Sequence, residues 1–312
     1  MNHGSLWTRW RAGVSWMWVA PPFESYLRDR DQAAVMNLET RDRYHAKQGR
    51  STARVVLRSD RPDSRGPLAV YLKRHYQLSA RERMLALFDP AGPHTPAAAE
   101  RRNLERAAAL GVPVPEVVAA GGRTGPRGRL ESFLMIAELR SSAALNEILP
   151  TLVTHMGKSR FDKLKRALAR ELARITATLH SAGMFHSDLY LCHFFLERAG
   201  EGDPSDRPRL ALIDLHRAVE PRFGRFWRRW KDLGQLLYST HEVACVGDRD
   251  RLRFLVHYRR MTGVRGARFL AMLVQFRAAR YEGHNQKRPR SAASAAPAHG
   301  VSTSAPSAAG GS

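Results

Sequence analysis

The chain has 312 residues and carries 51 Lys and Arg against 29 Asp and Glu, a formal net charge of +22. Such an excess favours polyanionic partners, but the basic residues are spread over the whole length, which weakens the prediction of a nucleic-acid-binding module without removing it. Two cysteines exclude a disulfide framework, and neither an apolar run long enough to span a bilayer nor the order of a signal peptide is present, so we expect a protein of a reducing compartment without a membrane span.

Residues 1–40 are predicted to form an N-terminal extension rich in Trp and Arg. Trp together with Arg is typical of a segment that lies at a membrane interface. The alternative is that the rings pack against the domain, as most large aromatic side chains do. The four tryptophans are Trp7, Trp10, Trp16 and Trp18.

Residues 41–138 are predicted to form a small lobe with an antiparallel sheet. Strands are expected at 54–58 and 68–73, where apolar residues flank a turn rich in Pro, Gly, Asp and Ser. A short polar loop precedes the first strand, and its backbone N–H groups are suited to bind phosphate, although a plain surface turn has a similar composition. The loop residues are Gly49, Arg50, Ser51 and Thr52.

A helix is predicted to begin at Thr95-Pro96, because Thr is a frequent N-cap and Pro fits the first helical position. A Gly-Val-Pro-Val-Pro sequence ends it. Since a helix has about 3.6 residues per turn, Glu100 shares a face with Leu104 while Glu105 points elsewhere. Glu100 is therefore expected on the buried side, where an ammonium group on a strand is able to meet it. The alternative for either glutamate is an ordinary surface ion pair.

Two further strands are predicted at 112–120 and 129–139. The second turns abruptly polar at Glu138 and Leu139, which is typical of a strand that leads into a connector between lobes. A long helix is then predicted from Ser159, because its apolar residues recur every three or four positions along one face.

The stretch with the most chemical information is 186–193, His-Ser-Asp-Leu-Tyr-Leu-Cys-His. Asp188 lies on a polar loop after the long helix, and Asp214 ends a short apolar run 26 positions later. A strand, a turn and a second strand are expected to bring both aspartates to neighbouring strand ends. Two such carboxylates suit phosphoryl transfer, in which one accepts the proton of the attacking hydroxyl and the other holds a metal on the nucleotide phosphates.

A basic aromatic run follows, with several arginines, Phe226, Trp227 and Trp230 between positions 217 and 230. A new helix is expected to begin at Lys231. Asp232 then either caps this helix or braces the 186–193 loop.

The larger lobe is predicted to span residues 139–283 and to be mainly helical, with an amphipathic helix at 265–281 near its end. Residues 284–312 consist largely of Ala, Ser, Pro and Gly with a few basic residues. Such a segment buries too little apolar surface to fold, so we predict a disordered tail.

The order of these elements resembles the protein-kinase signature, in which His-x-Asp is followed by a metal ligand and then by a metal-binding Asp at a strand end. The match is partial, since Ser187 replaces an arginine that reads an activating phosphate and His193 replaces an asparagine. With Asp-Leu-Tyr-Leu-Cys-His-Phe at 188–194 and Ile-Asp-Leu-His-Arg at 213–217, the chain resembles the lipopolysaccharide core kinases, the Kdo/heptose kinase family, over roughly residues 40–280. The resemblance implies a two-lobed α+β, protein-kinase-like fold, with a small antiparallel sheet lobe that holds one helix and a larger, mainly helical C-terminal lobe.

The resemblance also assigns roles. Asp188 would be the catalytic base, Asp214 the principal ligand of Mg²⁺, and His193 a further candidate metal ligand. Imidazole is a poor ligand for Mg²⁺, so for His193 a contact with phosphate or water and a merely packed ring stay open. Lys73 would hold the ATP phosphates with Glu100 orienting it, the alternative being a solvated lysine at a strand end. The nucleotide site would further comprise Gly49, Arg50, Ser51, Thr52, Glu138 and Leu139.

The predicted function is ATP-dependent phosphorylation of a sugar hydroxyl, on Kdo or heptose, in the lipopolysaccharide inner core, at the cytoplasmic face of the inner membrane. The expected partners are this glycolipid and the anionic membrane surface, which the arginines between 217 and 229 suit. The sequence does not determine the oligomeric state. Alternatives are a non-catalytic pseudokinase or anionic-surface binder, and a kinase of another small-molecule or protein substrate. Only 18 positions separate Asp214 from Asp232, which leaves little room for the peptide-docking segment of a protein kinase.

Overall fold

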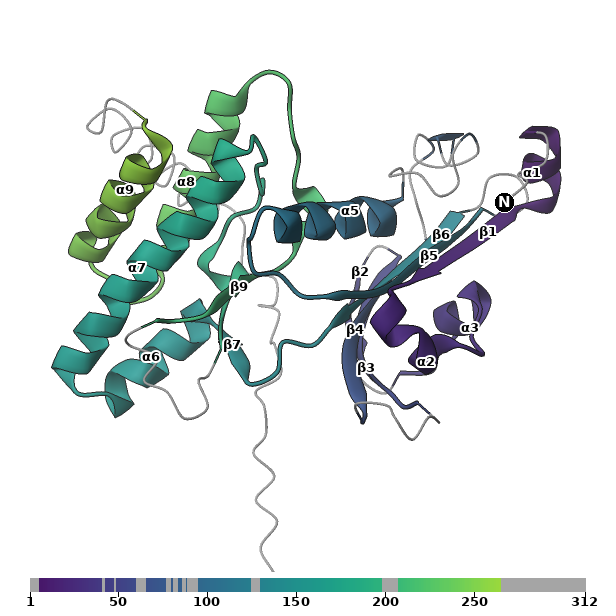
Figure 1. Cartoon of the computed structure of the whole chain (residues 1–312), viewed down its shortest axis with the longest axis horizontal. Helices are drawn as coiled ribbons and strands as arrows, with labels where there is room; N and C mark the ends of the chain where they lie inside the picture. Colours follow the sequence, from purple (N-terminus) through teal and green to yellow (C-terminus); the bar gives the residue numbers. More distant parts are fainter. Residues whose placement is uncertain are drawn as a thin grey trace, which may run out of the picture.

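The computed structural model contains two lobes, one built on a six-stranded sheet and the other mainly helical (Figure 1). This arrangement confirms the predicted α+β fold. The helix predicted at 265–281 and the tail predicted at 284–312 lie outside the residues that the structure describes. The described residues are 6–40, 43–47, 49–59, 66–76, 80, 84–85, 88, 95–124, 130–197 and 207–264.

The sheet of the small lobe has the strand order β1-β5-β6-β4-β3-β2, and neighbouring strands are antiparallel. Its strands are β1 (Val14–Val19), β2 (Arg43–Lys47), β3 (Arg50–Leu57), β4 (Leu68–His75), β5 (Val117–Thr124) and β6 (Leu130–Ala137). β3 begins at Arg50, earlier than the predicted strand. β5 begins later than predicted, because Pro113 and Pro115 lack the N–H groups that a strand ladder needs.

The N-terminal segment contributes to this sheet, since β1 pairs with β5. The side chain of Trp16 is buried, and the ring of Trp18 lies 4.1 Å from the guanidinium carbon of Arg101. Packing, the alternative to membrane contact, therefore holds for these two tryptophans. Trp7 remains 64% exposed. The short helical elements of this segment are α1 (Leu6–Ala12), η1 (Pro21–Phe23), α2 (Glu24–Leu27) and α3 (Gln32–Met36).

Helix α5 (Pro96–Ala109) crosses the junction of the lobes, where it contacts β5, β6 and the η4 turn (Leu215–Arg217) of the larger lobe (Figure 1). The Thr95 hydroxyl accepts a hydrogen bond from the Ala98 N–H at 3.1 Å, which confirms the predicted N-cap. Glu100 is 2% exposed, whereas the Glu105 side chain is 43% exposed and pairs with Arg101 on the surface. The helical spacing thus identified the inward-facing glutamate correctly.

The larger lobe combines a three-stranded sheet of order β7-β8-β9 with four helices that the structure describes. α8 begins at Arg225, ahead of the predicted start at Lys231, because Gly224 adopts the left-handed φ of 73° that opens the helix. α6, whose pattern is interrupted by Pro150, and α9 were not predicted. The elements are β7 (Ser142–Ala144), α6 (Leu145–His155), α7 (Lys158–Ser181), η3 (Leu191–His193), β8 (Phe194–Glu197), β9 (Leu210–Leu212), α8 (Arg225–His241) and α9 (Asp248–Thr262).

One continuous cluster of buried side chains joins the lobes and includes Leu104 of α5, Leu164 of α7 and Leu212 of β9. A second cluster fills the other face of the large sheet, where α2 and α3 pack against β4 and β6. The buried guanidinium of Arg74 fastens that side by donating to the carbonyl groups of Met36 and Leu38 at 2.8 and 2.9 Å. None of the helices in the described ranges has the length and apolar character needed to cross a bilayer.

Candidate active site

The 186–193 loop follows α7, and Gly183, two residues beyond the end of that helix, turns the chain with a left-handed φ of 79°. Its first two backbone N–H groups, those of His186 and Ser187, each donate to the Asp232 carboxylate at 2.8 Å. Asp232 lies within α8 and has no exposed side-chain surface. Of the two predicted alternatives, Asp232 therefore braces the loop rather than capping a helix. A buried carboxylate with two such bonds holds the loop firmly.

Two stacked imidazoles connect this loop to the end of β9. His186 donates from Nε2 to the Ile213 carbonyl at 3.0 Å, and its ring stacks on His193 with centroids 5.4 Å apart. His193 donates from Nδ1 to the main-chain oxygen of Asp188 at 2.8 Å. In the neutral ring, Nε2 therefore carries the lone pair, and it lies 3.9 Å from Oδ2 of Asp214. One histidine thus links the two aspartates that the sequence singled out.

Asp214 occupies a left-handed backbone conformation, with φ 62° and ψ 51°. Non-glycine residues in this region are uncommon and gather at functional sites. Its Oδ1 accepts from Nδ1 of His216 at 2.8 Å and from Nζ of Lys73 at 3.1 Å. Burial raises the pKa of Asp214, but the hydrogen bond from His216 and the charges of Lys73, His216 and His193 outweigh it, so the pKa lies well below its ordinary value. The carboxylate is therefore ionised throughout the neutral range.

Lys73 joins the two lobes electrostatically. Its ammonium group on β4 lies 2.6 Å from Oε1 of Glu100 on α5 and 3.1 Å from Oδ1 of Asp214 after β9. Burial lowers the pKa of Lys73, and the two carboxylates, Glu100 first, more than compensate and raise it. This is the buried contact expected for Glu100, and it excludes the alternative of a solvated lysine at a strand end.

Few side chains at this site are able to bind a metal ion. Among the residues that the structure describes, no three His, Cys, Asp or Glu side chains converge as in a protein-only metal centre. Mg²⁺ is commonly held by one or two carboxylates together with substrate phosphates, so the ionised Asp214 fits it. His193 fits it less well, since imidazole favours softer metals.

The predicted phosphate loop differs from expectation. Gly49 turns with a φ of 71°, and its carbonyl accepts from the Tyr76 N–H at 2.7 Å. Arg50, Ser51 and Thr52 belong to β3 rather than to a loop, because they pair with β4. Thr52 lies opposite Lys73, and cross-strand partners share a face, so Thr52 faces the Lys73 side while Ser51 is buried on the other.

Glu138 and Leu139 form the start of the connector between the lobes. The Glu138 carboxylate receives two hydrogen bonds from Arg54, both at 2.7 Å, and its N–H donates to the Ala69 carbonyl at 2.9 Å. The Leu139 carbonyl accepts from the Ser142 hydroxyl at 2.7 Å. The connector is thus held by the sheet on one side and by β7 on the other.

Two residues beside Asp188, Gln235 and Lys231, were not predicted as part of the site, whereas Arg217 belongs to the basic run that the sequence placed next to it. Nε2 of Gln235 lies 3.4 Å from Asp188 Oδ1, and Nη1 of Arg217 lies 3.8 Å from the same oxygen. Lys231 donates to the Ser187 carbonyl at 2.6 Å. Lys231 and Gln235 are four residues apart on α8 and therefore share a face of that helix. The sequence contains no motif that would have assigned His216, two positions after Asp214, to the site.

Comparison with known proteins agrees with this geometry. The profile of the lipopolysaccharide kinase (Kdo/WaaP) family matches residues 38–258. The lipopolysaccharide core heptose(I) kinase WaaP of Pseudomonas aeruginosa is 31% identical over 238 residues, which cover 76% of this chain and 84% of that protein. WaaP of Escherichia coli K12 is 36% identical over 97 residues, 31% of this chain and 36% of that protein. A solved structure, "WaaP in complex with acyl carrier protein", is similar with a TM-score of 0.61 and 29% identity, over 86% of this chain and 98% of that one. The chain therefore belongs to the lipopolysaccharide kinase (Kdo/WaaP) family, a family of phosphotransferases, as its sequence indicated.

Proposed function

We propose that the chain is an ATP-dependent kinase that phosphorylates a heptose hydroxyl of the lipopolysaccharide core. The observation that carries this proposal is the simultaneous contact of Lys73 with Glu100 and Asp214, at 2.6 and 3.1 Å. Kinases require the lysine–glutamate pair and the metal-binding aspartate to be in place together. Heptose is favoured over Kdo because the similar curated proteins are named heptose(I) kinases.

In this mechanism the Asp188 carboxylate, 22% exposed, accepts the proton of the acceptor hydroxyl. The hydroxyl oxygen attacks the terminal phosphorus of ATP, the bond to the bridging oxygen breaks, and ADP leaves. Gln235 and Arg217 hold the Asp188 carboxylate in position, and Lys73 binds the ATP phosphates. When bound by Asp214, with His193 beside it, Mg²⁺ would neutralise phosphate charge.

The acceptor side of the site is basic. Arg217 lies 3.8 Å from Asp188 Oδ1, and Nη1 of Arg228 lies 3.5 Å from the Ser187 hydroxyl. The lipopolysaccharide core carries carboxylates and phosphates, and a planar guanidinium group binds either one in a bidentate manner. Arg217 and Arg228 are therefore proposed to bind the anionic groups that flank the reacting sugar.

Labelled ATP and a heptose-containing core acceptor test this function directly. Asp188→Asn and Asp214→Asn should each lower label transfer by roughly a hundredfold or more, since loss of a general base alone costs about 10²–10⁴ in rate. Asp248→Asn makes the same chemical change at a 96% exposed site and should leave transfer unchanged. Transfer that survives Asp188→Asn would reject the mechanism, and a wild-type protein without transfer would favour the pseudokinase alternative.

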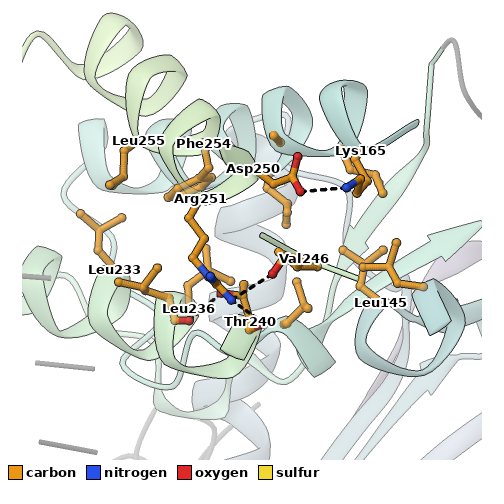
Figure 2. A pocket seen from close by; sticks show the side chains of 16 residues that line it. Leu145, Lys165, Leu233, Leu236, Thr240, Val246, Asp250, Arg251, Phe254 and Leu255 are labelled. Carbon is orange, nitrogen blue, oxygen red and sulfur yellow. Dashed lines mark hydrogen bonds and ion pairs between the residues drawn. The ribbon is translucent and has the colours of Figure 1, made fainter. Parts of the chain in front are cut away.

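The larger lobe also contains a pocket that is suited to bind part of a partner molecule. It lies among α6, α7, α8 and α9 (Figure 2). Its walls are leucines such as Leu145, Leu233 and Leu236, while the Lys165–Asp250 ion pair at 3.0 Å contributes a polar wall. The similar solved structure holds an acyl carrier protein. We therefore propose that this chain binds an acylated carrier protein and that the apolar acyl chain enters the pocket.

A further inference from the structure

Three aromatic side chains stand exposed beside the 186–193 loop, on the connection from η4 to α8 and on the first turn of α8. Phe223 is 89% exposed, Phe226 50% and Trp227 63%. Residues 221–231 also contain five basic residues and no acidic one. Large aromatic side chains are normally buried, so three exposed ones in one basic segment indicate an interaction surface. We name residues 222–228 the aromatic–arginine patch.

The patch is fixed to the candidate active site. Arg225 donates from Nε to the Pro221 carbonyl at 3.2 Å, and its guanidinium group packs so closely on Gly183 that a Cβ there would lie 3.0 Å from it. Trp227 rests on the buried Trp230, with ring centroids 5.2 Å apart. The connection reaches the upper edge of the larger lobe in Figure 1, where α8 begins. These contacts hold the exposed rings at the start of α8, where Nη1 of Arg228 lies 3.5 Å from the Ser187 hydroxyl.

We infer that the aromatic–arginine patch docks the protein on an anionic bilayer, with Phe223, Phe226 and Trp227 entering the headgroup region. This inference rests on the proposed function, since the acceptor would be a membrane glycolipid. Aromatic rings next to arginines are typical of interfacial binding, because the rings bury apolar surface while the arginines meet anionic headgroups. Docking in this way would bring Asp188 to the membrane surface, where the acceptor sugar lies.

A protein partner fits this patch less well. A stable protein interface buries about 800 Å² on each side. The exposed large apolar surface here is confined to three side chains from one turn and one helix start, a shape suited to shallow insertion. Of the N-terminal tryptophans whose side chains the structure describes, Trp16 and Trp18 pack within the small lobe and Trp7 is exposed.

Vesicle sedimentation tests the inference with the full-length chain. Wild type should bind vesicles of phosphatidylglycerol and phosphatidylethanolamine more tightly than vesicles of phosphatidylcholine. The double variant Phe223→Ser/Trp227→Ser should bind vesicles with an affinity lower by roughly tenfold or more, because the two rings no longer bury apolar surface in the headgroup region. Arg222→Gln should weaken binding to the anionic vesicles only. Trp7→Ser is the matched control, because Trp7 on α1 is 64% exposed, close to the 63% of Trp227.

A second readout separates docking from catalysis. The double variant should phosphorylate a deacylated, water-soluble core acceptor at the wild-type rate and the vesicle-embedded acceptor more slowly. Unchanged vesicle binding in the double variant, a loss of binding in Trp7→Ser alone, or a loss of carrier-protein binding in place of vesicle binding would each overturn the inference. Wild type that binds vesicles through the patch but phosphorylates neither acceptor would reject the proposed function and leave the docking surface standing.

Discussion

His193 donates a hydrogen bond from Nδ1 to the main-chain oxygen of Asp188, 2.8 Å away. This bond determines which ring nitrogen faces Asp214, and it explains how a histidine occupies a position where protein kinases carry an amide. The ring acts as a spacer between the loop and the end of β9, and Nε2 remains directed towards the Asp214 carboxylate. Whether His193 also binds metal stays a prediction.

Removal of Lys73 should destabilise the fold as well as abolish activity. Lys73→Met leaves the Glu100 carboxylate, 2% exposed, without its cation, and breaking a buried pair from one side costs about 3–5 kcal/mol. The double variant Lys73→Met/Glu100→Gln should recover part of that loss, because no buried charge is left unpaired. Unfolding in denaturant measures both values. Arg106→Met, which breaks the half-exposed pair with Glu220, should cost less than about 1 kcal/mol. Equal costs for Lys73→Met and Arg106→Met would contradict the buried pair.

Asp232 should control the geometry of the 186–193 loop. Asp232→Asn weakens the bonds to the N–H groups of His186 and Ser187, and hydrogen bonds to a charged group contribute about 1.5–3 kcal/mol each. We expect lower stability together with a lower kcat, because Asp188 follows Ser187 directly. Asp250→Asn, a change at another largely buried aspartate that pairs with Lys165, should lower stability without lowering the kcat of the folded protein. A normal kcat in folded Asp232→Asn would show that the brace does not position Asp188.

Mild acid should destabilise the small lobe through His75 at the end of β4. Burial, followed by the charges of Arg50, Lys73 and His216, lowers the pKa of His75 from 6.5 to about 4. Between pH 6.5 and pH 4 the unfolded chain binds a proton at this position and the folded chain does not, so stability falls as the pH is lowered. The loss should approach about 3 kcal/mol, at roughly 1.4 kcal/mol per pH unit.

The variant His75→Leu removes this titration and should flatten the dependence of unfolding free energy on pH across that window. His155→Gln, at an exposed position of α6, is the control for loss of one imidazole. Burial also lowers the pKa of His180 and of His186, so the test is the difference between variant and wild type at each pH. Parallel curves would contradict a neutral, buried His75.

A substitution that narrows the apolar pocket should weaken the binding of an acyl chain there. Leu255→Trp on α9 narrows the pocket (Figure 2). Leu252→Trp on the same helix changes a 60% exposed position that does not line the pocket. A lauroyl-loaded acyl carrier protein should raise the Tm of wild type and of Leu252→Trp, because a ligand of the folded state stabilises it. The rise should be smaller for Leu255→Trp. An equal rise in all three proteins would place the acyl chain elsewhere.

Local signals in the amino-acid order were sufficient for several of these features. The Thr95 cap and the inward face of Glu100 follow from spacings of a few residues, and the place of Asp214 after β9 follows from the short apolar run that precedes it. Such patterns reflect the repeat of a helix or the alternation of a strand, so they persist whatever the rest of the chain does.

Tertiary packing decided the rest. β1 joins the sheet through a partner about a hundred positions away, at Val14 and Thr124. The pocket needs α6 and α9 together, and the exposure of Trp227 depends on which face of α8 the core covers. Trp16 and Trp227 both belong to segments that carry tryptophans and arginines, yet one is buried and the other is exposed. Burial is a property of neighbours brought together by folding, and for that reason only the three-dimensional arrangement distinguished a packed tryptophan from a candidate membrane contact.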